Sequence, residues 1–205
     1  DMALYAAKAQ GRGELCFFTP QMQAQVAERV QLEADMRKGL DAGQFELFYQ
    51  PKTEGGRIIG AEALVRWRHP QRGMVSPAQF IALAEETRLI WPLGDAVMRM
   101  ACEQLARWAG HPVLGRLTVS VNVSALQFRQ KQFAPQLLAL LAQTGAPTRC
   151  IKLELTESML LDDTESTITK MRQLKAYGVS FSLDDFGTGY SSLSYLKRLP
   201  LDELK

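Results

Sequence analysis

Four polar side chains in the sequence have the types and the strand positions needed to bind a metal ion. They are Glu62, Asn122, Glu154 and Asp184. Each lies in a β-rich run on the side that alternates with apolar residues, so the four are expected to share one face of a sheet. A single acid in a strand is usually solvated or paired with an arginine. Four carboxylate or amide groups on one face that points into a helix-covered barrel are costly unless protonated, paired or bound to a cation.

The predicted ligands favour a hard cation. The neighbouring bases Arg66 and Lys152 are too few to neutralise all of the acids. No histidine falls in a predicted strand, and His69 and His111 stand beside prolines in predicted loops, where surface positions are expected. Oxygen ligands without histidine or cysteine select Mg²⁺ or Mn²⁺ over zinc. The sequence therefore predicts a Mg²⁺ or Mn²⁺ site.

A second acid and a glycine turn follow directly after Asp184. The segment from Asp184 to Ser192 contains Asp185, and its glycines form a flexible turn. Adjacent carboxylates at the end of a strand can bind or bridge two cations. The simpler interpretation is a strand-to-helix turn with a helix cap. Chemistry in barrels lies at the carboxyl ends of the strands, which is where Glu157, Asp184 and Asp185 fall.

Strand-like and helix-like segments alternate from residue 45 onward. The predicted strands are 45–50, 58–67, 117–123, 151–157, 179–184 and 201–205. The predicted helices between them are 77–90, 92–109, 130–143 and 164–177. This order indicates an α/β fold with a parallel sheet and crossover helices. Because no dinucleotide-binding glycine motif follows the first strand, we expect an interrupted eight-stranded barrel and not a doubly wound sheet.

Composition limits the possible partners and the cellular location. The chain has 205 residues, 46% of them hydrophobic, and a formal net charge of +2, which provides no general field for duplex nucleic acid. Three distant cysteines, Cys16, Cys102 and Cys150, fit neither a disulfide framework nor a zinc pattern. A reducing cytoplasm is therefore expected. No apolar run approaches the roughly 20 residues that span a bilayer, so no membrane contact is expected from this segment.

Six sequence blocks resemble the EAL family of cyclic-di-GMP phosphodiesterases, in the family's order. They are Tyr49-Gln50-Pro51, Glu62 to Trp67, Asn122-Val123-Ser124, Glu154 to Glu157, Asp184 to Ser192 and Leu204-Lys205. The resemblance covers about residues 22–205. It implies a TIM-like (β/α) barrel with an antiparallel first strand. It also implies metal-dependent cleavage of cyclic di-GMP, a bacterial second messenger, to linear pGpG.

The same resemblance implies a role for each site residue. Glu62, Asn122, Glu154 and Asp184 would bind one divalent ion, and Asp185 would reach a second. Lys205 would position or activate the attacking water, and Glu157 would steady the loop at 185–192. Gln50, Leu64 and Arg66 would contact the substrate. The implied mechanism is in-line attack on phosphorus by a water that the cation activates.

The ends of the chain predict its domain organisation. Residues 1–18 resemble the C-terminal tail of a GGDEF diguanylate cyclase domain, residues 19–43 are expected to form a connecting helix, and residues 44–205 the EAL domain. The expected parent is a tandem GGDEF–EAL protein that forms a homodimer, and an upstream membrane anchor is left open. Because the chain ends at Lys205, at the start of the sixth strand, two further strands are expected after it. We therefore expect residues 1–205 alone to be inactive.

Two other functions are compatible with parts of this pattern. The first is a receptor module that binds cyclic di-GMP without cutting it. Such domains usually lose metal ligands or the glycine loop, and this chain keeps those within its length. The second is an unrelated metal-dependent barrel of the aldolase or enolase type, against which the six ordered blocks argue.

Overall fold

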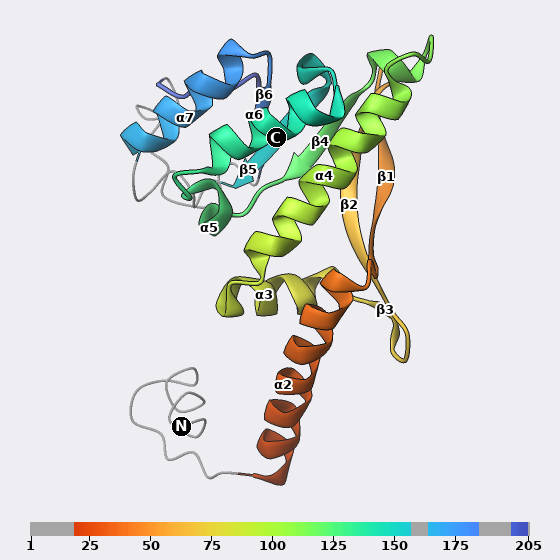
Figure 1. The fold of residues 1–205 in the computed structure, drawn as a ribbon, viewed down its shortest axis with the longest axis vertical. Coiled ribbons are helices and arrows are strands. Elements are labelled where there is room, and N and C mark those ends of the chain that lie inside the picture. The colour runs from red at the N-terminus through yellow and green to blue at the C-terminus, as the bar shows by residue number, and fades with distance from the viewer. Residues whose placement is uncertain (1–18, 157–163, 185–197, 205) are drawn as a thin grey trace.

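The computed structural model describes residues 19–156, 164–184 and 198–204 (Figure 1). The helices are α2 (Pro20–Asp41), α3 (Pro77–Thr87), α4 (Ile90–Trp108), α5 (Ala125–Phe128), α6 (Phe133–Thr144) and α7 (Thr164–Ala176). The strands are β1 (Phe45–Glu54), β2 (Arg57–His69), β3 (Gly73–Val75), β4 (Thr118–Asn122), β5 (Ile151–Thr156), β6 (Ser180–Asp184) and β7 (Glu203–Leu204). Strands and helices alternate along most of the chain, as the sequence predicted.

The strands form a single, mostly parallel sheet in the order β1-β2-β4-β5-β6-β7, with β3 paired to the end of β2. Strand β1 runs antiparallel to β2. The neighbouring pairs β2–β4, β4–β5, β5–β6 and β6–β7 are parallel. The predicted α/β class and antiparallel first strand are therefore confirmed. Among the described residues β1 and β7 do not pair, so this part of the sheet is open.

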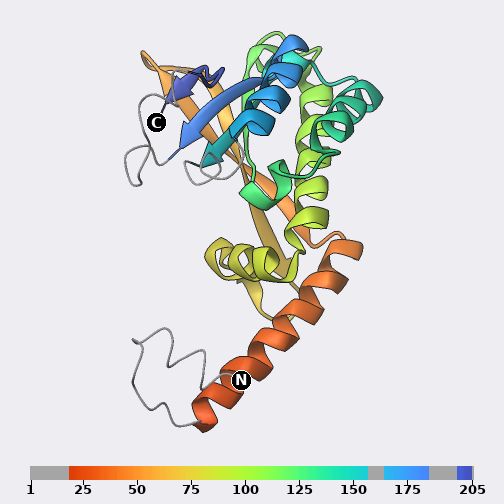
Figure 2. The ribbon, with the colours of Figure 1, turned by 90° about the vertical axis from the view of Figure 1, so that its left-hand side faces the viewer.

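Helices cover one face of the sheet, and the apolar core lies beneath them. Figure 2 shows α4, α6 and α7 together on this side, and α4 contacts β1 and β4 while α7 contacts β6. The strand residues that point toward the helices are fully buried: Val119, Val121, Leu153, Leu155, Phe181 and Leu183. Burying one such side chain contributes roughly 1.5–3 kcal/mol. This layer fixes which face of every strand is left for polar residues.

Helix α2 projects from the rest of the domain (Figure 1). Thr19 caps it, accepting a hydrogen bond from the backbone N–H of Met22 at 3.2 Å, and Pro20 occupies the first helical turn. Only Met36 and Gly39, near its C-terminal end, are buried. There the helix meets the aromatic side chain of Trp67, which stacks on Phe45. Near its middle, Glu28 and Arg29 form ion pairs with Arg72 and Glu86, so the helix contacts the domain from its middle to its C-terminal end.

Three local features differ from the sequence-based expectations. Strands β1 and β2 are longer than predicted and meet in a tight turn at Gly55 and Gly56, both with positive φ. The short elements β3 and α5 were not predicted. The surface position expected for His69 was wrong, because this side chain is only 5% exposed.

Neighbouring groups explain why His69 can be buried. Its Nδ1 accepts hydrogen bonds from the backbone N–H groups of Gln71 and Arg72, each at 3.1 Å. Its Nε2 lies 3.3 Å from a carboxylate oxygen of Asp35 on α2. Both ring nitrogens therefore have partners, as a buried imidazole requires. His111 is exposed, as predicted.

We expect Gly60→Ala to destabilise the domain. Gly60 pairs with Thr118, and an added Cβ would lie 2.6 Å from the Thr118 backbone oxygen. The strands would have to separate, which should lower the free energy of unfolding by roughly 1–3 kcal/mol in urea denaturation. Gly110→Ala is the control, because nothing lies within 4 Å of its added methyl group. Equal effects of the two substitutions would contradict the close packing of β2 and β4.

Candidate active site

Polar residues from successive strands share the sheet face that is opposite to the helix-covered core. In the pairing of β2 with β4, Glu62 is level with Ser120. In the pairing of β4 with β5, Asn122 is level with Glu154. Further along the sheet, Glu154 is level with Ser182, and Thr156 is level with Asp184. The four residues predicted as ligands, Glu62, Asn122, Glu154 and Asp184, therefore lie on one face. We call this the inner face.

Glu62 and Asn122 are in direct contact on the inner face. The side-chain nitrogen of Asn122 donates a hydrogen bond to Oε1 of Glu62 at 2.8 Å. This contact leaves the Asn122 side-chain oxygen as a ligand beside a carboxylate, a combination that suits Mg²⁺ or Mn²⁺. The structure thus brings together two of the four predicted ligands.

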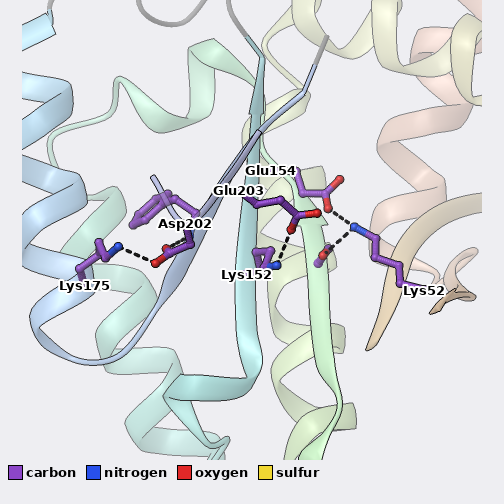
Figure 3. A network of polar contacts seen from close by, with 8 residues as sticks. Lys52, Lys152, Glu154, Lys175, Asp202 and Glu203 are labelled. Carbon is purple, nitrogen blue, oxygen red and sulfur yellow. Dashed lines mark hydrogen bonds and ion pairs between the residues drawn. The ribbon is translucent and has the colours of Figure 1, made fainter. Parts of the chain in front are cut away.

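Glu154 is the most deeply buried acid of the inner face, with a side chain that is 0% exposed. The ammonium group of Lys52 on β1 forms an ion pair with its Oε1 (Figure 3). The same ammonium donates a hydrogen bond to Oγ of Ser120 at 3.0 Å. Because an uncompensated charge is costly in such surroundings, the ammonium of Lys52 stabilises an ionised Glu154 there.

A second lysine and the last described strand complete this polar network. Lys152 Nζ lies 2.6 Å from a carboxylate oxygen of Glu203 on β7. The neighbouring Asp202 accepts hydrogen bonds from Lys175 at 2.7 Å and from the backbone N–H of Phe181 at 2.8 Å. Figure 3 shows the two lysine–glutamate pairs close to one another. These contacts attach β7 to the edge of β6.

The described acids do not form a ready-made metal cluster. Within residues 19–156, 164–184 and 198–204, no three His, Cys, Asp or Glu side chains are grouped closely enough to hold an ion. Glu154 is turned toward Lys52, and Asp184 is half-buried beyond it. The predicted residues Asp185, Glu157 and Lys205 and the loop at 185–192 lie outside the described residues. Convergence of the four ligands on one ion therefore stays a prediction.

A cavity of about 310 Å³ opens beside these residues, at the carboxyl ends of β2, β4 and β5. Its lining includes Leu64, Arg66, Asn122, Glu154 and Thr156. The guanidinium of Arg66 donates to the backbone oxygen of Val65 at 3.0 Å and lies 5.7 Å from the centre of the Phe48 ring. Gln50 is exposed on β1, opposite Glu62, and does not line this cavity.

The described cysteines offer no nucleophile. Cys102 and Cys150 are free and buried. Burial raises the pKa of the Cys102 thiol to about 12 and also raises the pKa of Cys150. Because the thiolate is the reactive form, thiol chemistry is disfavoured at both positions.

The comparison with known families decides the assignment of the chain. The model of the EAL domain family matches residues 33–205. The chain belongs to this family. The match begins within α2.

Two curated relatives align with the whole chain. The chain is 46% identical over 210 residues to the bifunctional diguanylate cyclase/cyclic di-GMP phosphodiesterase MucR of Pseudomonas aeruginosa. It is 42% identical over 206 residues to the cyclic di-GMP phosphodiesterase PdeR of Escherichia coli. The chain spans only 30% of the length of MucR and 31% of that of PdeR.

A solved structure has the same fold. The PaMucR phosphodiesterase, in complex with c-di-GMP, matches this structure with a TM-score of 0.79 and 44% identity, over 85% of this chain and 71% of that one. The predicted TIM-like α/β fold is therefore confirmed. Among the helices that the structure describes, none has the length and apolar character to span a bilayer.

Lys52 and Ser182 were not predicted as site residues. The first predicted strand ends at Gln50, whereas β1 continues through Pro51 to Glu54; proline is uncommon within strands, so the continuation carries no strong local signal. Strand alternation carried through Pro51 would have placed Lys52 on the same face as Gln50. Ser182, level with Glu154, also lies on the inner face. Its fully buried hydroxyl has no hydrogen-bond partner among the described residues.

We expect Asp202→Ala to loosen the attachment of β7. The substitution removes the acceptor for the backbone N–H of Phe181, a fully buried residue, as well as the partner of Lys175. Leaving a buried donor unsatisfied should cost roughly 1–3 kcal/mol in the free energy of unfolding, measured by urea denaturation. Glu28→Ala, which removes a largely exposed ion pair with Arg72, is the control and should have a much smaller effect. A negligible loss in the Asp202 variant would contradict this anchoring role.

Proposed function

We propose that the EAL domain hydrolyses cyclic di-GMP to linear pGpG and depends on Mg²⁺ or Mn²⁺. The observation that carries the proposal is that Arg66, Asn122 and Glu154 line the same cavity. A guanidinium suits a phosphodiester, and the neighbouring oxygen ligands suit a hard cation. The names of MucR and PdeR and the c-di-GMP complex of PaMucR support this substrate.

The residues of the inner face fit a divalent cation by charge and by ligand type. Glu62 and Asn122 are already in contact, and the buried Glu154 is already balanced by a positive charge. The hydroxyl of Ser182, level with Glu154, has no hydrogen-bond partner among the described residues and is a further oxygen on this face. We propose that Glu62, Asn122, Glu154 and Asp184 hold the cation, with Asp185 at a second one.

Each protein group has a distinct task in this proposal. Arg66 binds a phosphate oxygen, while Leu64 and Gln50 contact the rest of the dinucleotide. The carboxylates of Glu62 and Glu154 fix the positive charge beside the scissile phosphate. When bound, the cation supplies Lewis-acid stabilisation of the charge that develops on phosphorus. Lys205 orients the attacking water, and Glu157 steadies the segment at 185–192.

The domain organisation is part of the same proposal. Residues 1–18 are assigned to the tail of a GGDEF domain, residues 19–43 to a connecting helix and residues 44–205 to the EAL domain. The alignment of the whole chain with MucR, whose name includes a diguanylate cyclase, supports this organisation. The proposed protein acts in the cytoplasm as a homodimer.

We expect Glu62→Ala in the full-length protein to abolish hydrolysis while preserving the fold. Glu62 lies on the inner face between Ala61 and Ala63, which supply the packing. Loss of a group that stabilises developing charge should lower kcat by roughly 10²-fold or more. The measurements are chromatographic conversion of cyclic di-GMP to pGpG with Mg²⁺ or with EDTA, and thermal melting. Glu103→Ala, an exposed acid on α4, is the control.

Two results would contradict the assignment. One is a wild-type rate in the Glu62 variant. The other is a wild-type protein that binds cyclic di-GMP without cutting it, which would favour the receptor function.

We expect Arg66→Met to weaken substrate binding more than catalysis. Arg66 lines the cavity, and the loss of its charge-assisted hydrogen bonds to phosphate should raise KM roughly tenfold or more. Arg66→Lys should recover part of this loss, because the charge remains but the planar fork does not. The control is Arg68→Met, since Arg68 is paired with Glu46 and is largely exposed. Equal KM values for the Arg66 and Arg68 variants would argue against phosphate binding by Arg66.

A further inference from the structure

Lys52 reaches the inner face from the antiparallel strand β1. Lys52 pairs with Gly60 on β2, and Glu62 lies two residues after Gly60 on that strand. From there its ammonium contacts Ser120 on β4 and Glu154 on β5, so one side chain joins three strands (Figure 3). The Lys52 side chain is 23% exposed, whereas that of Glu154 is 0% exposed.

The pairing of Lys52 with Glu154 has two opposite electrostatic effects. In the domain without a cation, the ammonium compensates the charge of a buried carboxylate, and removing one member of a buried ion pair is strongly destabilising. When a cation binds Glu154, the same ammonium is a like charge within a few ångströms, and repulsion at partly buried positions is substantial. Lys52 therefore stabilises the metal-free domain and opposes cation binding.

We propose that Lys52 is a positioning residue that takes the place of the divalent cation at Glu154 in the metal-free domain and thereby weakens cation binding. The proposal rests on the metal-dependent function above and adds a residue outside the predicted ligand set. The ammonium holds the Glu154 carboxylate on the inner face before a cation arrives. It then yields that carboxylate to the cation and lowers the cation's affinity.

The domain contains a matched control for this inference. Lys152 also lies on the inner face, beside Ser120 in the register, and its side chain is 19% exposed. It forms an ion pair with Glu203 on β7, which the proposed cation set does not include. The two lysines thus have similar burial and charge but different acidic partners.

The test measures cation affinity and thermal stability in the full-length protein without nucleotide. Dissociation constants for MgCl₂ and MnCl₂ come from calorimetry and from the free Mn²⁺ signal in electron paramagnetic resonance. Melting temperatures are compared in EDTA and in Mg²⁺. The variants are Lys52→Met, Lys52→Gln, Lys52→Arg and Lys152→Met. The glutamine variant can still donate a hydrogen bond to Glu154 and gives the measurement if the methionine variant does not fold.

The expected result is a gain in affinity together with a loss of metal-free stability. Lys52→Met or Lys52→Gln should bind both ions roughly tenfold more tightly or better. In EDTA, the melting temperature of either variant should be lower than that of the wild type. Adding Mg²⁺ should raise the melting temperature of the variant by more than it raises that of the wild type. Lys52→Arg should resemble the wild type because it keeps the charge. Lys152→Met should show no gain in affinity.

Two outcomes would overturn the inference in distinguishable ways. If the Lys52 variants bind cations no more tightly than the wild type and lose the same stability in both media, Lys52 has only a structural role. The proposed function would then be unaffected. If the wild-type protein binds neither ion, the proposed metal-dependent function fails, and this inference fails with it.

Discussion

The structure depends on the charge balance around one buried carboxylate. Glu154 cannot be ionised in the middle of the sheet without a positive partner, and Lys52 supplies it from the antiparallel strand. This contact ties β1 to β5 across two intervening strands. The requirement to balance Glu154 thus links the direction of the first strand to the chemistry of the site.

The division of each strand into an apolar and a polar side follows from the same sheet geometry. Residues such as Val121 and Leu153 pack beneath the helices, so their neighbours Asn122 and Glu154 must point the other way. The strand register is therefore fixed, because a slip of one residue would turn the acids toward the helices and the apolar residues away from them. Packing energy on one face thereby fixes the position of polar groups on the other.

Strand alternation explains what the sequence could predict. The period of two residues was sufficient to place Glu62, Asn122 and Glu154 on one face, and the order of segments was sufficient for the α/β class. The partners of these residues could not be predicted in the same way. Lys52 lies beyond a proline and meets Glu154 across 102 positions of sequence. Burial of His69 depends on Asp35 of α2, which no local pattern reveals.

Helix α2 is attached to the domain from its middle to its C-terminal end, because Glu28 and Arg29 pair with Arg72 and Glu86, and Asp35 pairs with His69. With 22 residues it is roughly 33 Å long, and its buried contacts are near its C-terminal end. Those contacts include Asp35 with His69 at the end of β2, the strand that also carries Arg66 and Glu62. A force applied to the N-terminal end of α2 would be transmitted through these contacts. Strand β2, which carries the first predicted metal ligand and the arginine predicted to bind phosphate, is therefore one of the elements coupled to a movement of α2.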